Sequence, residues 1–228
     1  MKAALLRLSD RLYDDGAAKY GVLPAPLIAA TLVTGVVDAV CYLALGHIFV
    51  ANMTGNVVFL GFALAGAKGL TVWAPCLAIA CFAAGAWTET RLARRSPGGT
   101  DHHRLANAIA SHAGFVTVAL LIAALENDDK TATHAQLIAI LAFGFGLQNA
   151  VVRKVGVPDL TTTVLTMTVT GLAADPLGKP TVRRLLSLGC IFLGALFGGL
   201  LVLHQSISAA LGLALALLVV SAVLARLG

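Results

Sequence analysis

Long apolar stretches dominate the chain, and short polar stretches separate them. Six of these stretches are long enough to cross a bilayer as helices of about 20 residues. They cover residues 27–46, 71–92, 106–125, 134–152, 182–203 and 207–227. The pattern therefore predicts an all-α polytopic membrane protein with six transmembrane helices.

Two further apolar stretches, 50–67 and 161–174, are shorter and open with polar and β-branched residues. The first opens with Asn52-Met53-Thr54-Gly55-Asn56 and the second with Thr161-Thr162-Thr163-Val164-Leu165-Thr166. Asn and Thr are good N-cap residues, so we expect helices to start near Asn52 and Thr54, and near Thr162 and Thr163. We expect these helices to end near Lys68-Gly69 and Asp175-Pro176. Each would be a re-entrant half-helix that enters and leaves on one side of the membrane.

The distribution of basic residues decides between crossing and re-entry, because cytoplasmic loops carry an excess of Lys and Arg. With both short segments re-entrant, only Lys68 and Lys130 of the 16 Lys and Arg residues fall outside. If both crossed, six basic residues would fall outside: Arg91, Arg94, Arg95, Arg104, Arg153 and Lys154. The first arrangement is favoured. It puts both termini in the cytoplasm and the acidic loop 126–129 outside.

The same order of segments occurs twice along the chain: a long span, a short segment that opens with polar residues, and two more long spans. Some residues also match between the two halves. Gly35, Asp38, Ala39 and Val40 recur at constant spacing as Gly146, Asn149, Ala150 and Val151. Three spans per half force the second copy to run in the opposite direction, which is a transporter and channel architecture. We therefore expect one membrane domain, 1–228, with two inverted-topology repeats at 25–126 and 131–228. Residues 1–24 would form an amphipathic interfacial segment.

Composition supports the prediction of a membrane protein, because 58% of the residues are hydrophobic and only 12% are charged. Soluble domains have about 25% charged residues. The formal net charge of +5 lies in short loops, where it indicates topology and anionic lipid contact instead of nucleic-acid binding. The four cysteines lie inside apolar segments without metal-ligand spacing. The chain has no HExxH, GxSxG or catalytic Cys–His pattern. We predict no enzyme activity, no cofactor and no metal.

Polar residues inside the apolar segments are the candidate site. Asp38 lies near the middle of the first span, where an acid is costly unless it is paired or hydrated. It is suited to accept hydrogen bonds from half-helix N–H groups, to bind a cation, or to carry a coupling proton. Half-helix N-termini at bilayer depth would favour an anionic or carbonyl-bearing ligand. The predicted substrate or ion site comprises Asp38, Tyr42, Asn52, Thr54, Asn56, Gln148, Asn149, Thr163 and Thr166.

These polar residues have a structural interpretation too, since hydrogen bonds between helices are ordinary stabilising contacts in membranes. Tyr42 lies one turn after Asp38 and has the spacing to hydrogen-bond it, or to anchor the helix at the interface. Gly194 and Gly198 form a GxxxG pattern that predicts close helix packing, within or between chains.

The runs from Gly35 to Gly46 and from Phe49 to Asn56 resemble the signature of the YoaK-like membrane proteins, also called domain of unknown function 1275. The run from Gly146 to Ala150 fits this resemblance, which covers nearly the whole chain. Met167 departs from it, because glycine would be expected there. The resemblance implies a bacterial inner-membrane protein of about this length, and it implies no substrate.

Two functions are consistent with these observations. The first is a channel or secondary transporter for a small polar solute or ion, with its site at the half-helices. The alternative is a non-transporting membrane subunit or assembly factor whose partner face is the glycine-rich span. The expected partners are the lipid bilayer, a small solute or ion, and a second copy of the chain in a homo-oligomer.

Overall fold

The computed structural model describes residues 1–95, 99–125, 130–163 and 165–228, and in these ranges the regular elements are α-helices. The helices are α1 (Lys2–Leu12), α2 (Gly16–Tyr20), α3 (Pro24–Ala44), α4 (Met53–Leu64), α5 (Trp73–Arg95), α6 (Asp101–Leu125), α7 (Thr131–Val155), α8 (Thr166–Ala174), α9 (Lys179–His204) and α10 (Ile207–Arg226). The acidic loop at 126–129 and Val164 lie outside the described residues. The all-α prediction is confirmed for the part of the chain that is described.

In the described part of the chain, five helices are long and apolar enough to cross a membrane: α3, α6, α7, α9 and α10. The sixth expected span corresponds to α5, which has 23 residues but is less apolar. Its second half carries Trp87, Thr88, Glu89, Thr90 and Arg91, which lower its hydropathy. The protein is therefore a multi-pass membrane protein, while the count of six spans stays a prediction.

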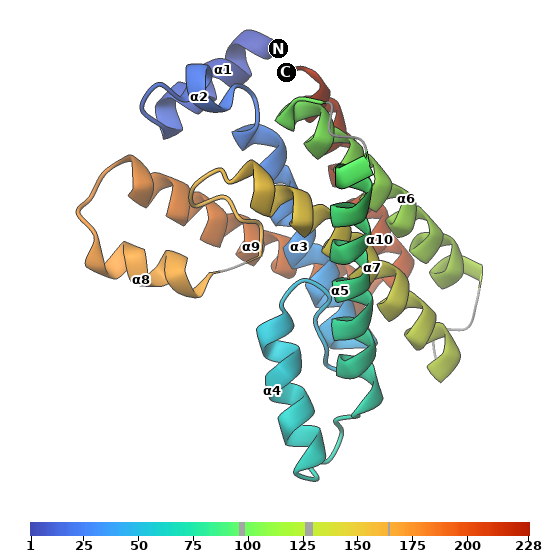
Figure 1. The fold of residues 1–228 in the computed structure, drawn as a ribbon. Helices are drawn as coiled ribbons and strands as arrows, with labels where there is room; N and C mark the ends of the chain where they lie inside the picture. Colours follow the sequence, from blue (N-terminus) through green and yellow to red (C-terminus); the bar gives the residue numbers. More distant parts are fainter. Residues whose placement is uncertain (96–98, 126–129, 164) are drawn as a thin grey trace.

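The long helices pack in pairs that join the two halves of the sequence. α3 packs against α9, α5 against α7, and α10 against both α3 and α6, while α6 also packs against α7. The two short helices lie at the outside of the bundle, α4 against α5 and α8 against α9 (Figure 1). Neither half forms a bundle by itself, because its helices find their main partners in the other half.

Glycines allow the closest of these contacts. A Cβ atom at Gly35 of α3 would collide with the carbonyl oxygen of Ile191 on α9. On the same two helices, Gly194 and Gly198 face Leu32 and Val36. The GxxxG pattern of α9 therefore packs within the chain. The other side of α9, with Phe192, Leu196 and Phe197, is exposed.

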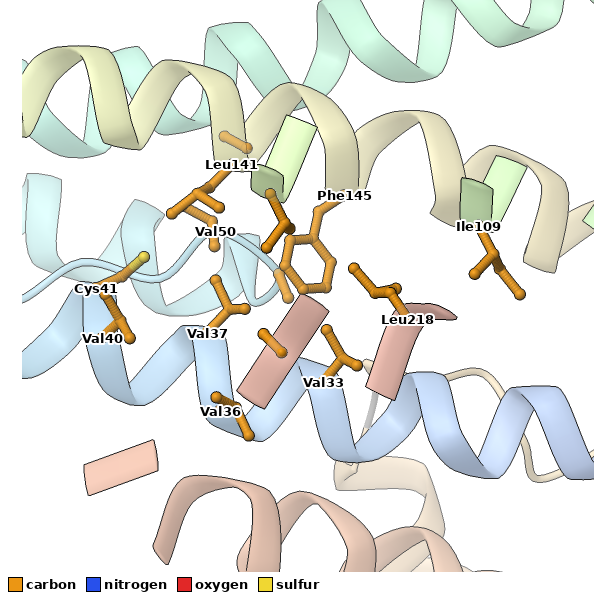
Figure 2. Packing of buried hydrophobic residues seen from close by; sticks show 14 of the residues in the cluster. Val33, Val36, Val37, Val40, Cys41, Val50, Ile109, Leu141, Phe145 and Leu218 are labelled. Atoms are coloured by element: carbon orange, nitrogen blue, oxygen red, sulfur yellow. The ribbon is translucent and has the colours of Figure 1, made fainter. Parts of the chain in front are cut away.

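The core lies between α3, α7 and α10 and includes the loop that follows α3. Figure 2 shows Val37 of α3, Val50 of this loop, Leu141 and Phe145 of α7, and Leu218 of α10 in one cluster of buried side chains. Val50 is fully buried. Irregular backbone at bilayer depth is tolerated only where protein or a water-filled cavity covers it, and protein covers this loop.

The N-terminal segment is docked on the bundle. α1 packs against α2, α3 and α9, and the Tyr13 hydroxyl donates a 2.7 Å hydrogen bond to the Pro158 carbonyl. Burial raises the pKa of Tyr13 above its ordinary value, so the hydroxyl keeps the proton that it donates. The chain termini meet at one end of the molecule (Figure 1), where Lys2 Nζ donates to the Gly228 carbonyl at 3.1 Å.

A partly buried ion-pair network lies beside this docked segment. Both Nε and Nη2 of Arg183 donate to Asp159 Oδ2, at 2.9 and 2.6 Å, and Arg183 Nη1 donates to the Leu12 carbonyl at 2.8 Å. Arg184 holds the other oxygen of Asp159 at 3.1 Å and pairs with Asp175 at 2.7 Å. The network joins α1, the loop between α7 and α8, and the start of α9.

Candidate functional site

Asp38 binds the loop that folds back after α3. The chain leaves α3 at Ala44 and reverses through Gly46 and His47, whose φ angles are 98° and 59°. The reversal brings the N–H groups of Val50 and Ala51 to Asp38 Oδ1, which accepts from both at 3.2 Å. Asp38 is half-buried. These N–H groups belong to the loop before α4, which begins at Met53, and not to the half-helix N-terminus that was expected to supply them.

Asn56 fixes the same loop from α4. Its Oδ1 accepts from the Phe49 N–H at 2.9 Å, and its Nδ2 donates to the Phe49 carbonyl at 2.6 Å. Asn56 is fully buried, and this pair of bonds mimics a strand-like pairing. Asn52 is the N-cap residue of α4, as expected, but its side chain makes no capping hydrogen bond. Asn52 and Thr54 are exposed.

Tyr42 packs with aromatic rings and forms no hydrogen bond with Asp38 in the described part of the chain. Its ring stacks on Phe49 at 5.5 Å between centroids and lies 5.1 Å from His47 and 6.2 Å from Phe59. Tyr42 is 38% exposed. This arrangement fits the anchoring interpretation of Tyr42 better than a role beside the carboxylate.

Asn149 binds the corresponding loop of the second half. Its Oδ1 accepts from Thr163 Oγ1 at 3.3 Å, and its Nδ2 donates to the Phe145 carbonyl at 2.9 Å. Asn149 and Asp38 thus have similar positions, each holding the loop after its own helix. Here the donor is a side-chain hydroxyl, whereas Asp38 accepts from two backbone N–H groups.

The start of α8 differs from the prediction. Thr162 and Thr163 do not cap this helix, which begins at Thr166 with Leu165 at the N-cap position. Thr162 has a φ angle of 64° and lies in the loop, with a buried Oγ1 that has no partner within the described residues. Thr166 is exposed. α8 ends at Ala174, next to the expected Asp175, whereas α4 ends at Leu64, before the expected Lys68.

A groove of about 740 Å³ opens beside Asn149 and Thr163. One wall is α5, and the other is the C-terminal part of α7 with the loop after it. The lining residues that carry polar side chains are Thr90, Asn149, Arg153, Lys154, Thr161 and Thr163. Phe82, Ala86, Val152 and Val157 supply an apolar surface. The size lies within the range of ordinary small-molecule sites, about 300 to 1,000 Å³.

The family model described as "Protein of unknown function (DUF1275)" matches residues 27–224. The chain belongs to the DUF1275 family. It is 31% identical over 148 residues to the UPF0700 transmembrane protein YoaK of Bacillus subtilis (strain 168). This alignment spans 65% of the present chain and 64% of the relative, slightly less than two thirds of the relative's length. No solved structure matches the chain.

In this DUF1275 protein the predicted site residues fall into two clusters. The first contains Asp38, Asn56 and the loop between them. The second contains Asn149 and Thr163 beside the groove. Gln148, although next to Asn149 in sequence, points to α6 and pairs with His112. Thr54 and Thr166 are exposed on the short helices.

Sequence reasoning missed several residues of the DUF1275 groove and core. Arg153 and Lys154 were interpreted only as topological charges, although their position at the end of a span next to a polar loop was a signal. His112 also gave a signal, because an ionisable residue within an apolar span is costly unless it has a partner. Thr90 gave none, since its role depends on the pairing of α5 with α7.

Proposed function

We propose that this protein is a channel or secondary transporter for a small polar solute or ion. The observation that carries the proposal is the groove of about 740 Å³ between α5 and α7. Its wall includes the interrupted segment after α7, through Thr161 and Thr163. Interrupted segments that line a cavity are the recurrent site of solute binding in transporters.

The pairing of helices supports an inverted repeat over 25–126 and 131–228. Exchanging the halves turns α3 into α7 and α5 into α9, so the α3–α9 contact becomes the α7–α5 contact. The same exchange relates α3–α10 to α7–α6, and α4–α5 to α8–α9. Gly35 against α9 and Gly146 against α5 repeat the same close approach. A two-fold relation of this kind is what alternating access between two sides requires.

The arrangement of charges supports six spans, two re-entrant half-helices and cytoplasmic termini. Lys2 contacts the C-terminal residue Gly228, and Lys179 and Arg183 bind the N-terminal segment at its Tyr13 and Leu12 carbonyls. The loop between α4 and α5, which contains Lys68, lies at the opposite end in Figure 1. We infer a bacterial inner membrane as the location, with α5 as the sixth span in contact with α7.

Flux into proteoliposomes tests the proposal. Purified protein would be assayed with a panel of small ions and polar solutes, with and without a pH gradient. The substitution Ala86→Trp fills the groove from α5, and Val219→Trp on an exposed face of α10 is the matched control. We expect flux of at least one solute in the parent and in Val219→Trp, and its loss in Ala86→Trp. Equal flux in Ala86→Trp, or no flux for any solute, would reject a pathway through the groove.

A further inference from the structure

The polar end of the groove is positively charged. Arg153 and Lys154, in the last turn of α7, are the charged residues among those that line it, and both are exposed. Among the described residues, no carboxylate belongs to the lining. A ligand in the groove therefore meets two cations and several hydroxyl and amide groups.

The two carboxylates that adjoin lining residues in the sequence, Asp159 and Glu89, are already engaged or shared. Asp159 follows the groove in sequence, but Arg183 and Arg184 bind both of its oxygens. Glu89 precedes the lining residue Thr90 and is close enough to Lys154 and Arg104 to interact electrostatically with both. Arg153 takes part in no ion pair within the described residues. It is the cation that a ligand is best able to neutralise.

The first half of the chain has no such charge. Asp38 stands where the second half has Asn149, and Tyr42 and Leu43 stand at the positions of Arg153 and Lys154. A cation in the last turn of a helix is favoured by the helix dipole. The dipole accounts for a charge at this position, but it does not account for an adjoining groove without carboxylates.

The rest of the groove is apolar. Phe82 and Ala86 of α5 line one wall, and Val152 and Val157 belong to the other. Apolar lining with a few polar groups at one end is the usual composition of sites for small organic molecules. A bare inorganic ion would leave this surface without a contact, whereas a molecule with an apolar body and an acidic group would use both ends.

We infer that the groove binds an amphipathic organic anion. Its acidic group lies at Arg153 and Lys154, where the guanidinium offers paired donors to a carboxylate or phosphate. Its apolar body lies along Phe82, Ala86, Val152 and Val157. The inference rests on the proposed function, for which it names the class of solute. A soluble carboxylic acid and the headgroup of an anionic lipid share this chemistry.

Equilibrium binding in phosphatidylcholine nanodiscs tests the inference with two probes. Cinnamate, with cinnamamide as its neutral counterpart, represents a soluble acid. Phosphatidylglycerol, detected by native mass spectrometry, represents a lipid. We expect at least one anion to bind saturably, with its affinity at least tenfold lower in Arg153→Gln/Lys154→Gln. Saturable cinnamate binding identifies a soluble acid, and retention of phosphatidylglycerol alone identifies a lipid.

Two further variants keep the test decisive. Arg153→Lys/Lys154→Arg keeps both charges and should bind as the parent does, which separates lost charge from lost folding. Lys68→Gln/Lys130→Gln removes the same number of charges elsewhere and should also bind normally. The inference is overturned if neither anion binds, if cinnamamide binds as tightly as cinnamate, or if the Gln variant retains full affinity.

The failure of this inference is distinguishable from the failure of the transport proposal. Anion binding without any solute flux would leave the inference intact and reject transport. Flux of cations or neutral solutes through the groove, without anion binding, would support transport and reject the inference that the groove binds an anion.

Discussion

The ring Nδ1 of His112 on α6 lies 2.8 Å from Oε1 of Gln148 on α7. Both side chains are fully buried, and the imidazole meets the Phe145 ring at 4.4 Å between centroids. Nε2 of His112 and Nε2 of Gln148 have no partner within the described residues. The two helices are thus joined by a polar pair whose remaining hydrogen-bonding groups face an apolar interface.

His112 and Gln148 should not contribute independently to stability. His112→Leu or Gln148→Leu alone leaves a buried polar group without its partner, which costs about 1 to 3 kcal/mol of unfolding free energy. The double variant removes both polar groups, so its loss should be smaller than the sum of the single losses. Thermal and denaturant unfolding in detergent would measure the stability of the parent, the two single variants and the double variant. Additive losses would contradict a direct interaction between the two side chains.

The glycines at the helix crossings should tolerate no methyl group. A Cβ atom at Gly146 would collide with the Phe82 carbonyl, just as one at Gly35 would collide with that of Ile191. We expect Gly35→Ala and Gly146→Ala each to destabilise the fold by about 1 to 3 kcal/mol or more, as overpacking does.

Gly114 and Gly189 provide the matched controls for these substitutions, because a Cβ atom there would meet no other described residue within 4 Å apart from the adjoining turns of its own helix. Alanine at these helical positions should leave the unfolding temperature unchanged or raise it, since alanine favours a helix by up to about 1 kcal/mol over glycine. Equal losses at all four glycines would show that the crossings are not the cause.

The length of the apolar stretches predicted the long helices, because a span must cover the bilayer with about 20 apolar residues. The role of Asn149 was also predictable, since it occupies the position in the second half that Asp38 has in the first. The groove was not predictable, because it forms where α5 meets α7, and helix pairing is not encoded locally. Thr162 and Thr163 were expected to cap α8 from their residue type, but the loop extends to Leu165.

Arg183 should hold the N-terminal segment on the bundle. Its guanidinium binds Asp159 and the Leu12 carbonyl and lies over the Tyr13 ring at 4.5 Å. Arg183→Met should cost at most about 3 kcal/mol, the low end of the range for a broken buried pair, because Asp159 is only half-buried and Arg184 still binds it. Trypsin should then cleave faster at Arg7 and Arg11 in α1, and the unfolding temperature should fall.

Asp14→Asn is the control for this network. It removes the exposed ion pair of Asp14 with Lys179, which lies at 2.9 Å and holds the pKa of Asp14 below its ordinary value. Exposed pairs contribute little to stability, so cleavage and unfolding should stay close to those of the parent. If trypsin cleavage and the unfolding temperature of Arg183→Met matched those of Asp14→Asn, the ion-pair network around Arg183 would not be what docks α1.

Asp38 should have separable structural and charge-dependent roles. Asp38→Asn keeps an oxygen that can accept from the N–H groups of Val50 and Ala51, whereas Asp38→Ala leaves both without an acceptor. The alanine variant should lose about 1 to 3 kcal/mol of unfolding free energy, and the asparagine variant much less.

If Asp38 also carries a coupling proton, Asp38→Asn should remain folded and lose the response of flux to a pH gradient. An asparagine variant as unstable as the alanine variant would show that the loop depends on the negative charge itself. An unchanged pH response in a folded Asp38→Asn protein would leave Asp38 with its structural role alone.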